Sequence, residues 1–247
     1  MTKIILCGAN GAMGKNLIEI IGEDPTLEIS AGIDHSPQEG SFPQYKTFDD
    51  GVQGDVIIDF SHFSMIPNLL DYVEKTKTPA VICTTGLSKE DEARIEALSK
   101  EVPLFRSGNM SLGINLLIAL AKKGAEVLGE NFDIEVVEMH HNRKIDAPSG
   151  TAYMIADEIN KTLDNSKEFN YGRYGNDTKR KANEIGIHAL RGGTVVGEHT
   201  VVFAGTDEMV RIEHRATSKK VFAQGAVRAA KFILNKENGL FNMNDML

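Results

Sequence analysis

Residues 3–14 read KIILCGANGAMG, and this stretch decides the first half of the fold. Its first five residues are the mostly apolar run of a buried strand, and glycines follow at positions 8, 11 and 14. Glycines at a strand-to-helix turn let a pyrophosphate approach backbone amides, and the helix that follows adds a partial positive charge. The spacing is G-x-x-G-x-x-G rather than the commoner G-x-G-x-x-G, so a plain tight turn is the alternative interpretation.

Short apolar runs alternate with helical patterns through the first hundred or so residues. The predicted strands are Lys3–Cys7, Glu28–Ile33, Asp55–Phe60, Ala80–Thr84 and Val102–Phe105, and the predicted helices are Met13–Ile21, Met65–Lys75 and Lys89–Lys100. The last helix follows a capping pattern at residues 88–91. Alternation of this kind predicts a Rossmann-type, doubly wound parallel sheet.

The pattern changes after a buried helix that we predict at Leu112–Leu128. The predicted strands are now Asp133–His140, Glu184–Arg191, His199–Phe203 and Val210–Arg215, with one helix from Pro148 to about Leu163. A last amphipathic helix at Ser218–Leu234 is expected to pack on the first domain. The sequence therefore predicts an α/β protein in which a Rossmann-type domain, residues 1–110 plus 217–247, holds an inserted α+β domain of residues 111–216. Such an insertion places a cleft between domains.

Composition excludes several classes of function. The 247 residues carry a formal net charge of −8, which argues against nonspecific nucleic-acid binding. The most apolar stretch, residues 112–128, is too short and too charged to cross a bilayer. Cys7 and Cys83 each end an apolar run and are expected to be buried thiols rather than a disulfide. With strand-like residues from Lys3 onward and no room for a secretion signal, we expect a cytoplasmic protein without membrane or nucleic-acid partners.

Polar residues follow several of the predicted strands. Asp34 lies twenty residues after Gly14, where a carboxylate can accept hydrogen bonds from an adenosine ribose. The strand ends at residues 59–61 and 83–86 would lie along the same carboxyl edge, where open parallel sheets bind nucleotides. Ordinary turn chemistry is the alternative for each of them. Together with the glycine turn, they predict a nicotinamide dinucleotide cofactor.

Residues 135–152, EVVEMHHNRKIDAPSGTA, concentrate the titratable groups. Four basic or titratable side chains fall within residues 140–144, and residues 148–151, PSGT, then open a helix with free backbone amides and a hydroxyl. This combination predicts an anion site in an acidic protein. Because adjacent strand residues point to opposite faces, we expect one of the two adjacent histidines to transfer protons and the other to bind. Lys144 stays cationic and can stabilise negative charge.

Other interpretations of this segment are weaker. A solvated basic loop with a structural histidine is the simplest of them. A metal site would draw on His140, His141, Asp146, His188, His199 and His214. No close pair among these stands at ligand spacing with a carboxylate or thiol, so we expect no metal. Ser149 lacks a nucleophile-elbow motif, which excludes a serine nucleophile of that type.

On these residues the sequence resembles the 4-hydroxy-tetrahydrodipicolinate reductase family, long called dihydrodipicolinate reductases, of the diaminopimelate route to lysine. The resemblance covers nearly the whole chain, and residues 135–152 are its most specific part. Further matching motifs lie at residues 8–14, 83–86, 108–113, 191–199 and 239–243. The resemblance implies that NADH or NADPH reduces a cyclic dicarboxylate at ring C4, with loss of the 4-hydroxyl as water.

The resemblance also assigns roles to individual residues. His140 would donate or accept the proton and Lys144 would be a second donor. The substrate carboxylates would be held by His141, Lys144, Gly150 and Thr151. The cofactor would be contacted by Gly8, Ala9, Asn10, Gly11, Ala12, Met13, Asp34, His35, Cys83, Thr84, Thr85, Ser107, Gly108, Asn109 and Met110. The inserted domain would bind the substrate and assemble a homotetramer through its sheet.

Two departures from the family pattern concern the cofactor. Cys83 stands where many relatives carry glycine, and His35 follows Asp34 where some relatives carry arginine or lysine. Asp34 alone favours NADH because its carboxylate repels a 2′-phosphate, whereas a partly protonated His35 can contact that phosphate. We therefore expect the protein to accept both NADH and NADPH.

Two other functions stay open at this level. One is a different two-domain dehydrogenase, such as one that acts on an amino-acid semialdehyde. The other is a dinucleotide sensor without turnover, which needs the glycine turn but gives no reason for the cluster in residues 135–152.

Overall fold

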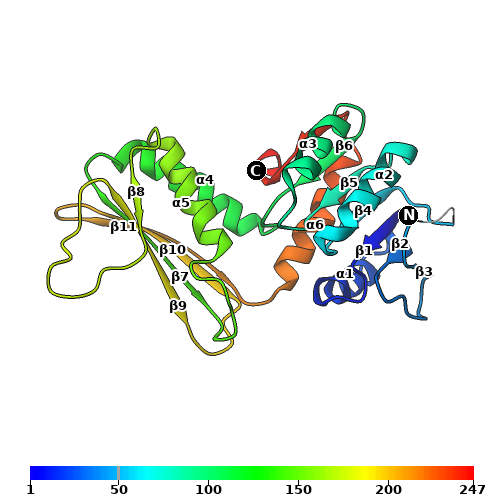
Figure 1. Cartoon of the computed structure of the whole chain (residues 1–247), viewed down its shortest axis with the longest axis horizontal. Helices are drawn as coiled ribbons and strands as arrows, with labels where there is room; N and C mark the ends of the chain where they lie inside the picture. The colour runs from blue at the N-terminus through cyan, green and yellow to red at the C-terminus, as the bar shows by residue number, and fades with distance from the viewer. Residues whose placement is uncertain (49–50) are drawn as a thin grey trace. The chain divides into compact units, whose positions relative to one another are not determined.

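The computed structural model describes residues 1–48 and 51–247 (Figure 1). These residues form two compact units. Unit 1 consists of residues 1–112 and 219–247, and unit 2 consists of residues 113–218. Unit 2 is thus an insertion in the chain of unit 1.

Unit 1 is built on a seven-stranded parallel sheet with the strand order β12-β6-β5-β4-β1-β2-β3. Its strands are β1 (Thr2–Cys7), β2 (Leu27–Ile33), β3 (Gln44–Tyr45), β4 (Val56–Asp59), β5 (Ala80–Ile82), β6 (Pro103–Arg106) and β12 (Gly239–Phe241). The chain runs outward from β1 to β3 and then returns to place β4 on the other side of β1. The carboxyl ends of β1 and β4 therefore form the switch point at which open α/β sheets bind ligands.

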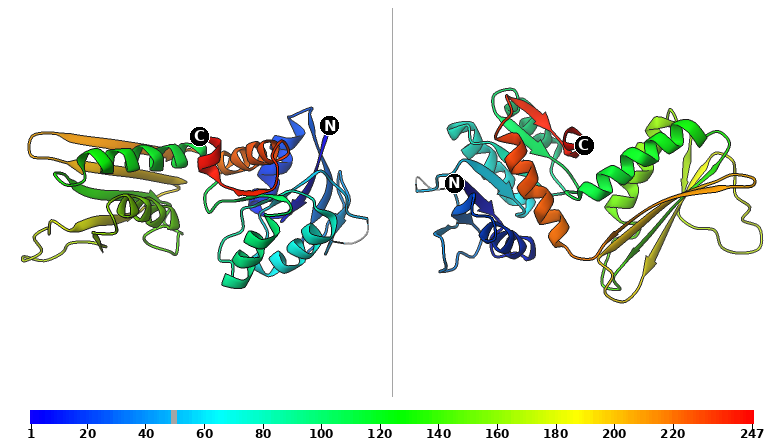
Figure 2. Two further views of the ribbon diagram at one scale, coloured as in Figure 1. Left: turned by 90° about the horizontal axis from the view of Figure 1, so that it is seen from above. Right: turned by 180° about the vertical axis from the view of Figure 1, so that it is seen from behind.

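Helices cover both faces of this sheet (Figure 2). They are α1 (Ala12–Gly22), α2 (Ile66–Thr76), α3 (Lys89–Leu98) and α6 (Lys220–Ile233), with short 3-10 helices η1 (Phe63–Met65) and η2 (Met243–Met246). Helices α1 and α6 enclose one core together with Ile4 and Leu6 of β1. Helices α2 and α3 enclose the other core with Ile5 and Cys7, because alternate strand residues point to opposite faces.

Unit 2 carries a five-stranded mixed sheet with the order β11-β10-β7-β9-β8. Its elements are α4 (Leu112–Leu128), β7 (Asp133–His140), α5 (Gly150–Thr162), β8 (Glu168–Asn170), β9 (Glu184–Arg191), β10 (Gly197–Ala204) and β11 (Met209–Ala216). Helices α4 and α5 pack on one face of the sheet, which we call the inner face (Figure 1). On β7 the inner face carries Ile134 and Val136 and then continues with Glu138 and His140, all of them buried.

The structure confirms the predicted α/β class and its Rossmann-type parallel sheet. The capping pattern at the start of α3 forms as a capping box between Ser88 and Asp91. Cys7 and Cys83 are buried free thiols, as predicted. Three strands were not predicted, β3, β8 and β12, because segments of two or three residues are too short to display a period. Within residues 1–48 and 51–247, no helix is long and apolar enough to cross a membrane.

Candidate active site

The glycine turn between β1 and α1 is shaped by close backbone contacts. Gly8 has φ +78°, and a Cβ there would lie 2.4 Å from the carbonyl oxygen of Phe60. A Cβ on Gly14 would lie 2.3 Å from two carbonyl oxygens of the turn. Gly11 caps α1, and no side chain of the described residues bonds to the amides of the first turn. These amides fit a pyrophosphate, which would satisfy them and benefit from the helix dipole.

Asp34 braces this turn, which the sequence did not reveal. One carboxylate oxygen accepts a hydrogen bond from the Asn10 backbone N–H at 2.9 Å, and the other accepts from Ser36 N–H at 3.0 Å. The Asn10 side chain in turn donates to Gln44 at 2.9 Å. A carboxylate has about four acceptor positions, so Asp34 can still accept bonds from a ribose. His35 is exposed and contacts the Ser36 hydroxyl at 3.1 Å.

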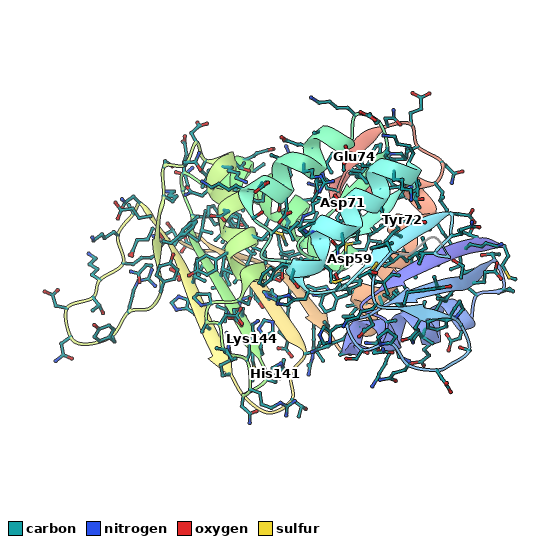
Figure 3. All side chains as sticks on the ribbon, turned by 45° about the vertical axis from the view of Figure 1, so that its right-hand side comes forward. Asp59, Asp71, Tyr72, Glu74, His141 and Lys144 are labelled. Atoms are coloured by element: carbon teal, nitrogen blue, oxygen red, sulfur yellow. The ribbon has the colours of Figure 1, made fainter. Side chains whose placement is uncertain are left out.

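The ends of β4 and β5 lie beside the glycine turn. The Cys83 N–H donates to the carbonyl of Asp59 at 3.0 Å, and the Thr84 hydroxyl donates to the carbonyl of Ser61 at 3.0 Å. Thr85 follows and is exposed. Burial raises the pKa of the Asp59 carboxyl, although bonds from Ser61 oppose this change (Figure 3). Cys83 and Thr84 themselves are almost fully buried, so their side chains pack beneath the carboxyl edge of the sheet.

Residues 107–110 follow β6 at the same edge of the sheet. The Ser107 hydroxyl donates to the Asn109 carbonyl at 2.9 Å, and the Asn109 side chain accepts from Ser111 N–H at 2.8 Å. Gly108 is exposed, whereas Met110 is buried in the core on the side of α1 and α6. The structure therefore brings the predicted cofactor residues of β1, β2, β5 and β6 to one carboxyl edge of the sheet.

A polar row ends the inner face of the sheet in unit 2. The strand register sets His199 opposite Glu138 and Arg191 opposite His140. Nδ1 of His140 lies 2.6 Å from the Glu138 carboxylate, and Arg191 donates to both carboxylate oxygens at 2.8 Å. The backbone N–H of Ser149, at the start of α5, donates to the same carboxylate at 2.9 Å. One buried carboxylate thus ties His140 to the start of a helix.

Ser149 and His199 extend the row. The Ser149 hydroxyl accepts from Ala152 N–H at 3.2 Å, which caps α5, and it lies 3.2 Å from Nε2 of His199. The rings of His140 and His199 meet edge to face, with centroids 5.2 Å apart. Burial, followed by the proximity of His140, lowers the pKa of His199 to about 3. His199 is therefore neutral at physiological pH.

Lys144 and His141 belong to the turn that follows β7 (Figure 3). The Lys144 backbone N–H donates to the carbonyl of His141 at 3.1 Å, and the Lys144 ammonium pairs with Asp146 at 2.8 Å. This pairing lowers the pKa of the Asp146 carboxyl. Gly150 and Thr151 form the first turn of α5, whose amides can receive an anion. The turn and the helix start offer a cation, a histidine and an anion-binding backbone within one short segment.

Three groups of this site, Glu138, Arg191 and His199, were not predicted from the sequence to belong to it, although His199 was considered as a metal ligand. The available signal was the spacing of Glu138 and His140, which are two residues apart and so share a face of the strand. Among the described residues, no group of three or more histidine, cysteine or acidic side chains is arranged to hold a metal ion.

Comparisons with known proteins cover nearly the whole chain. Residues 2–110 match the family model of the dihydrodipicolinate reductase N-terminus, and residues 113–247 match the model of its C-terminus. The chain belongs to the dihydrodipicolinate reductase family. A 4-hydroxy-tetrahydrodipicolinate reductase of Caldanaerobacter subterraneus is 52% identical over 248 residues, which cover 100% of this chain and 98% of that relative. One of Brachyspira hyodysenteriae is 44% identical and covers 98% of this chain and 99% of the relative.

The fold of this reductase family is also seen in a solved structure. A dipicolinate-bound dihydrodipicolinate reductase of Paenisporosarcina sp. TG-14 superimposes with a TM-score of 0.84 at 21% identity, over 100% of both chains. A probable dehydrogenase of Thermotoga maritima gives 0.63 at 14% identity, over 98% of this chain and 92% of that one. The two-part architecture is thus shared with other dehydrogenases, whereas the sequence match at 44% identity and above is to reductases of this family.

Proposed function

We propose that this chain reduces 4-hydroxy-tetrahydrodipicolinate to tetrahydrodipicolinate with NADH or NADPH, with loss of water, in lysine biosynthesis through diaminopimelate. The family match over both parts of the chain carries this proposal. The pairing of His140 with a buried carboxylate beside the start of α5 is consistent with it, because the reaction needs a proton donor next to a binding site for an anionic substrate.

We assign dinucleotide binding to unit 1. The NADH or NADPH bound there would supply the hydride. The first turn of α1 would receive the pyrophosphate, and Asp34 the adenosine ribose, with His35 beside it. The other proposed contacts are Gly8, Ala9, Asn10, Gly11, Ala12, Met13, Cys83, Thr84, Thr85, Ser107, Gly108, Asn109 and Met110. The close packing at Gly8 supports this assignment, since any side chain there would displace the turn.

Unit 2 is the substrate-binding part. We assign one substrate carboxylate to the amides of Gly150 and Thr151, with His141 and Lys144 nearby. Hydride addition to a ring conjugated with an imine pushes charge toward nitrogen. Lys144 stabilises this charge and His140 transfers the proton, which lowers the barrier. The Paenisporosarcina reductase was solved with dipicolinate bound, which is also a small cyclic dicarboxylate.

The competing functions are not favoured. A dehydrogenase of another pathway would share the fold, but the relatives at 44–52% identity over the full chain are reductases of this family. A sensor without turnover gives no reason for a histidine held by a buried glutamate.

Assembly and location are further parts of the proposal. The face of the unit 2 sheet opposite α4 and α5 carries Val137, Met139 and Val202, which are half-buried in the single chain. A second copy covering this face would bury them, and we propose a homotetramer assembled through it. Burial of both cysteines as free thiols supports the cytoplasm as the compartment.

The deciding experiment is a cofactor-oxidation assay with freshly generated 4-hydroxy-tetrahydrodipicolinate. We expect turnover with NADH, and a loss of about a hundredfold or more in kcat for His140→Gln and Lys144→Ala with little change in the KM for NADH. Lys161→Ala is a matched control, because its ion pair with Glu158 lies on the exposed side of α5. Near-normal kcat in both site variants would refute the residue assignment. Absence of turnover in the unaltered protein would refute the function.

A further inference from the structure

Glu138 is the most enclosed charged residue of unit 2, and its side chain is 0% exposed. Each of its oxygens accepts two hydrogen bonds. One oxygen receives His140 Nδ1–H and one Arg191 nitrogen, and the other receives Ser149 N–H and the second Arg191 nitrogen. Burial alone would raise the pKa of the Glu138 carboxyl, but the bonds from Arg191, His140 and Ser149 hold it below its usual range. The carboxylate is therefore ionised and all four of its acceptor positions are used.

The contact with Glu138 decides the tautomer of His140. An ionised carboxylate can only accept, so the His140 nitrogen at 2.6 Å must carry a proton. In the neutral ring this leaves Nε2 without a proton, and Nε2 is then the atom that gains or loses the proton in catalysis. Gly197 keeps space at this atom, because a Cβ there would lie 3.0 Å from Nε2.

Arg191 fixes Glu138 in turn. Its guanidinium makes a bidentate pair with the Glu138 carboxylate, and one of its nitrogens also donates to the Asp146 carbonyl at 2.7 Å. Asp146 is the residue that pairs with Lys144. The same two side chains thus contact His140, the segment that carries Lys144, and the start of α5.

We propose that Glu138, held by Arg191, is a positioning residue for the reductase reaction: it keeps His140 in its Nδ1–H tautomer and sets the distance from Nε2 to the anion site at the start of α5. This inference rests on the proposed function for its kinetic consequence. A buried ion pair with a purely structural role would stabilise unit 2 without selecting a tautomer of His140. The structural role and the positioning role can therefore be distinguished by experiment.

The test variant is Glu138→Gln in the full-length protein. A glutamine has one acceptor oxygen, and its N–H₂ group would face Arg191 together with either His140 or Ser149, so it cannot accept all four bonds. Long-range ¹H–¹⁵N spectra of the histidine rings report which nitrogen is protonated, and His140→Gln identifies the His140 signals among the seven histidines. We expect the Nδ1–H form in the unaltered protein and a shift toward the Nε2–H form in Glu138→Gln. We also expect kcat to fall by about tenfold to a hundredfold with the KM for NADH unchanged.

Glu135→Gln provides a closely matched control. Glu135 lies on the same strand but on the opposite face, and it also bonds a histidine, His188 at 2.6 Å, and two arginines, Arg173 and Arg180. Both variants remove a charge from a glutamate–histidine–arginine cluster, so a general loss of stability should appear in both. Only Glu138→Gln should change the His140 spectrum and weaken the binding of pyridine-2,6-dicarboxylate.

The outcomes separate the possibilities. An unchanged His140 spectrum in Glu138→Gln, or equal effects of the two variants on kcat and dicarboxylate binding, would overturn the inference. If Glu138→Gln does not fold, Arg191→Lys carries the same measurements, because lysine keeps a cation but cannot form the fork. If the unaltered protein shows no turnover, the proposed function fails while the spectra and the dicarboxylate binding still decide the role of Glu138.

Discussion

His199 should make this protein sensitive to mild acid, and the size of the effect follows from the structure. Its pKa is lowered from 6.5 to about 3, first by burial and then by His140. The folded protein therefore keeps His199 neutral where the unfolded chain binds a proton. A histidine with a lowered folded pKa contributes stability above its unfolded value, and that contribution is lost as the pH falls from 6.5 toward 3.

The magnitude does not depend on the exact folded value. At about pH 5, proton binding to an unfolded histidine with its ordinary pKa is worth about 2 kcal/mol, and at about pH 7.5 it is negligible. In His199→Gln this contribution disappears. When the pH falls from about 7.5 to about 5, the free energy of unfolding should therefore decrease by about 2 kcal/mol less in His199→Gln than in the unaltered protein.

Urea unfolding followed by far-UV circular dichroism measures both losses, since the chain has no tryptophan to report by fluorescence. Protein concentration must be held fixed, because self-association would add to stability. The raised pKa of Asp59, which lies in unit 1, acts in both proteins and cancels in the comparison. Equal losses, within about 0.5 kcal/mol, would show that His199 is not a buried neutral histidine.

Three further predictions concern other parts of the molecule. Gly186→Ala should destabilise unit 2 by about 1–3 kcal/mol in urea unfolding, because its Cβ would lie 1.7 Å from the Glu135 carboxylate. Gly22→Ala is the control and should be almost neutral, because there is open space around Gly22. The enzyme should use NADH and NADPH with comparable efficiency, and Asp34→Ala should raise the KM for NADH; a hundredfold preference for NADPH would contradict this. Pyridine-2,6-dicarboxylate should compete with the substrate in steady-state kinetics, and a noncompetitive pattern would argue against the anion site at the start of α5.

The architecture could be predicted from the sequence because its long elements have clear periods. The segment predicted at Leu112–Leu128 is α4, and the segment predicted at Asp133–His140 is β7, with the same bounds. Each follows from a pattern that its own residues display. The short strands β8 and β12 form because the neighbouring strands β9 and β6 offer them hydrogen bonds, and three residues of sequence do not reveal such a cause.

The site was only partly predictable. Residues 135–152 indicated a histidine, a lysine and a helix start close together, because they are close along the chain. Arg191 and His199 come from β9 and β10, which meet β7 only through the register of the sheet. Asp34 was predicted to accept hydrogen bonds from a ribose, and its additional bonds from the backbone of the glycine turn and its flank were not predicted. Contacts between segments that are far apart in the chain decide these roles, and a single sequence does not show such contacts.

Glu135 and Glu138 show most clearly why position on the sheet, and not residue type, assigns chemistry here. They are three residues apart on β7 and therefore point to opposite faces. Each binds a histidine at 2.6 Å and at least one arginine, but the side chain of Glu138 is 0% exposed and that of Glu135 is 20% exposed. Only the inner-face glutamate meets the start of α5. A slip of one residue in the pairing of β7 would exchange the two faces, so the apolar packing of Ile134 and Val136 against α4 and α5 is what places His140 at the anion site.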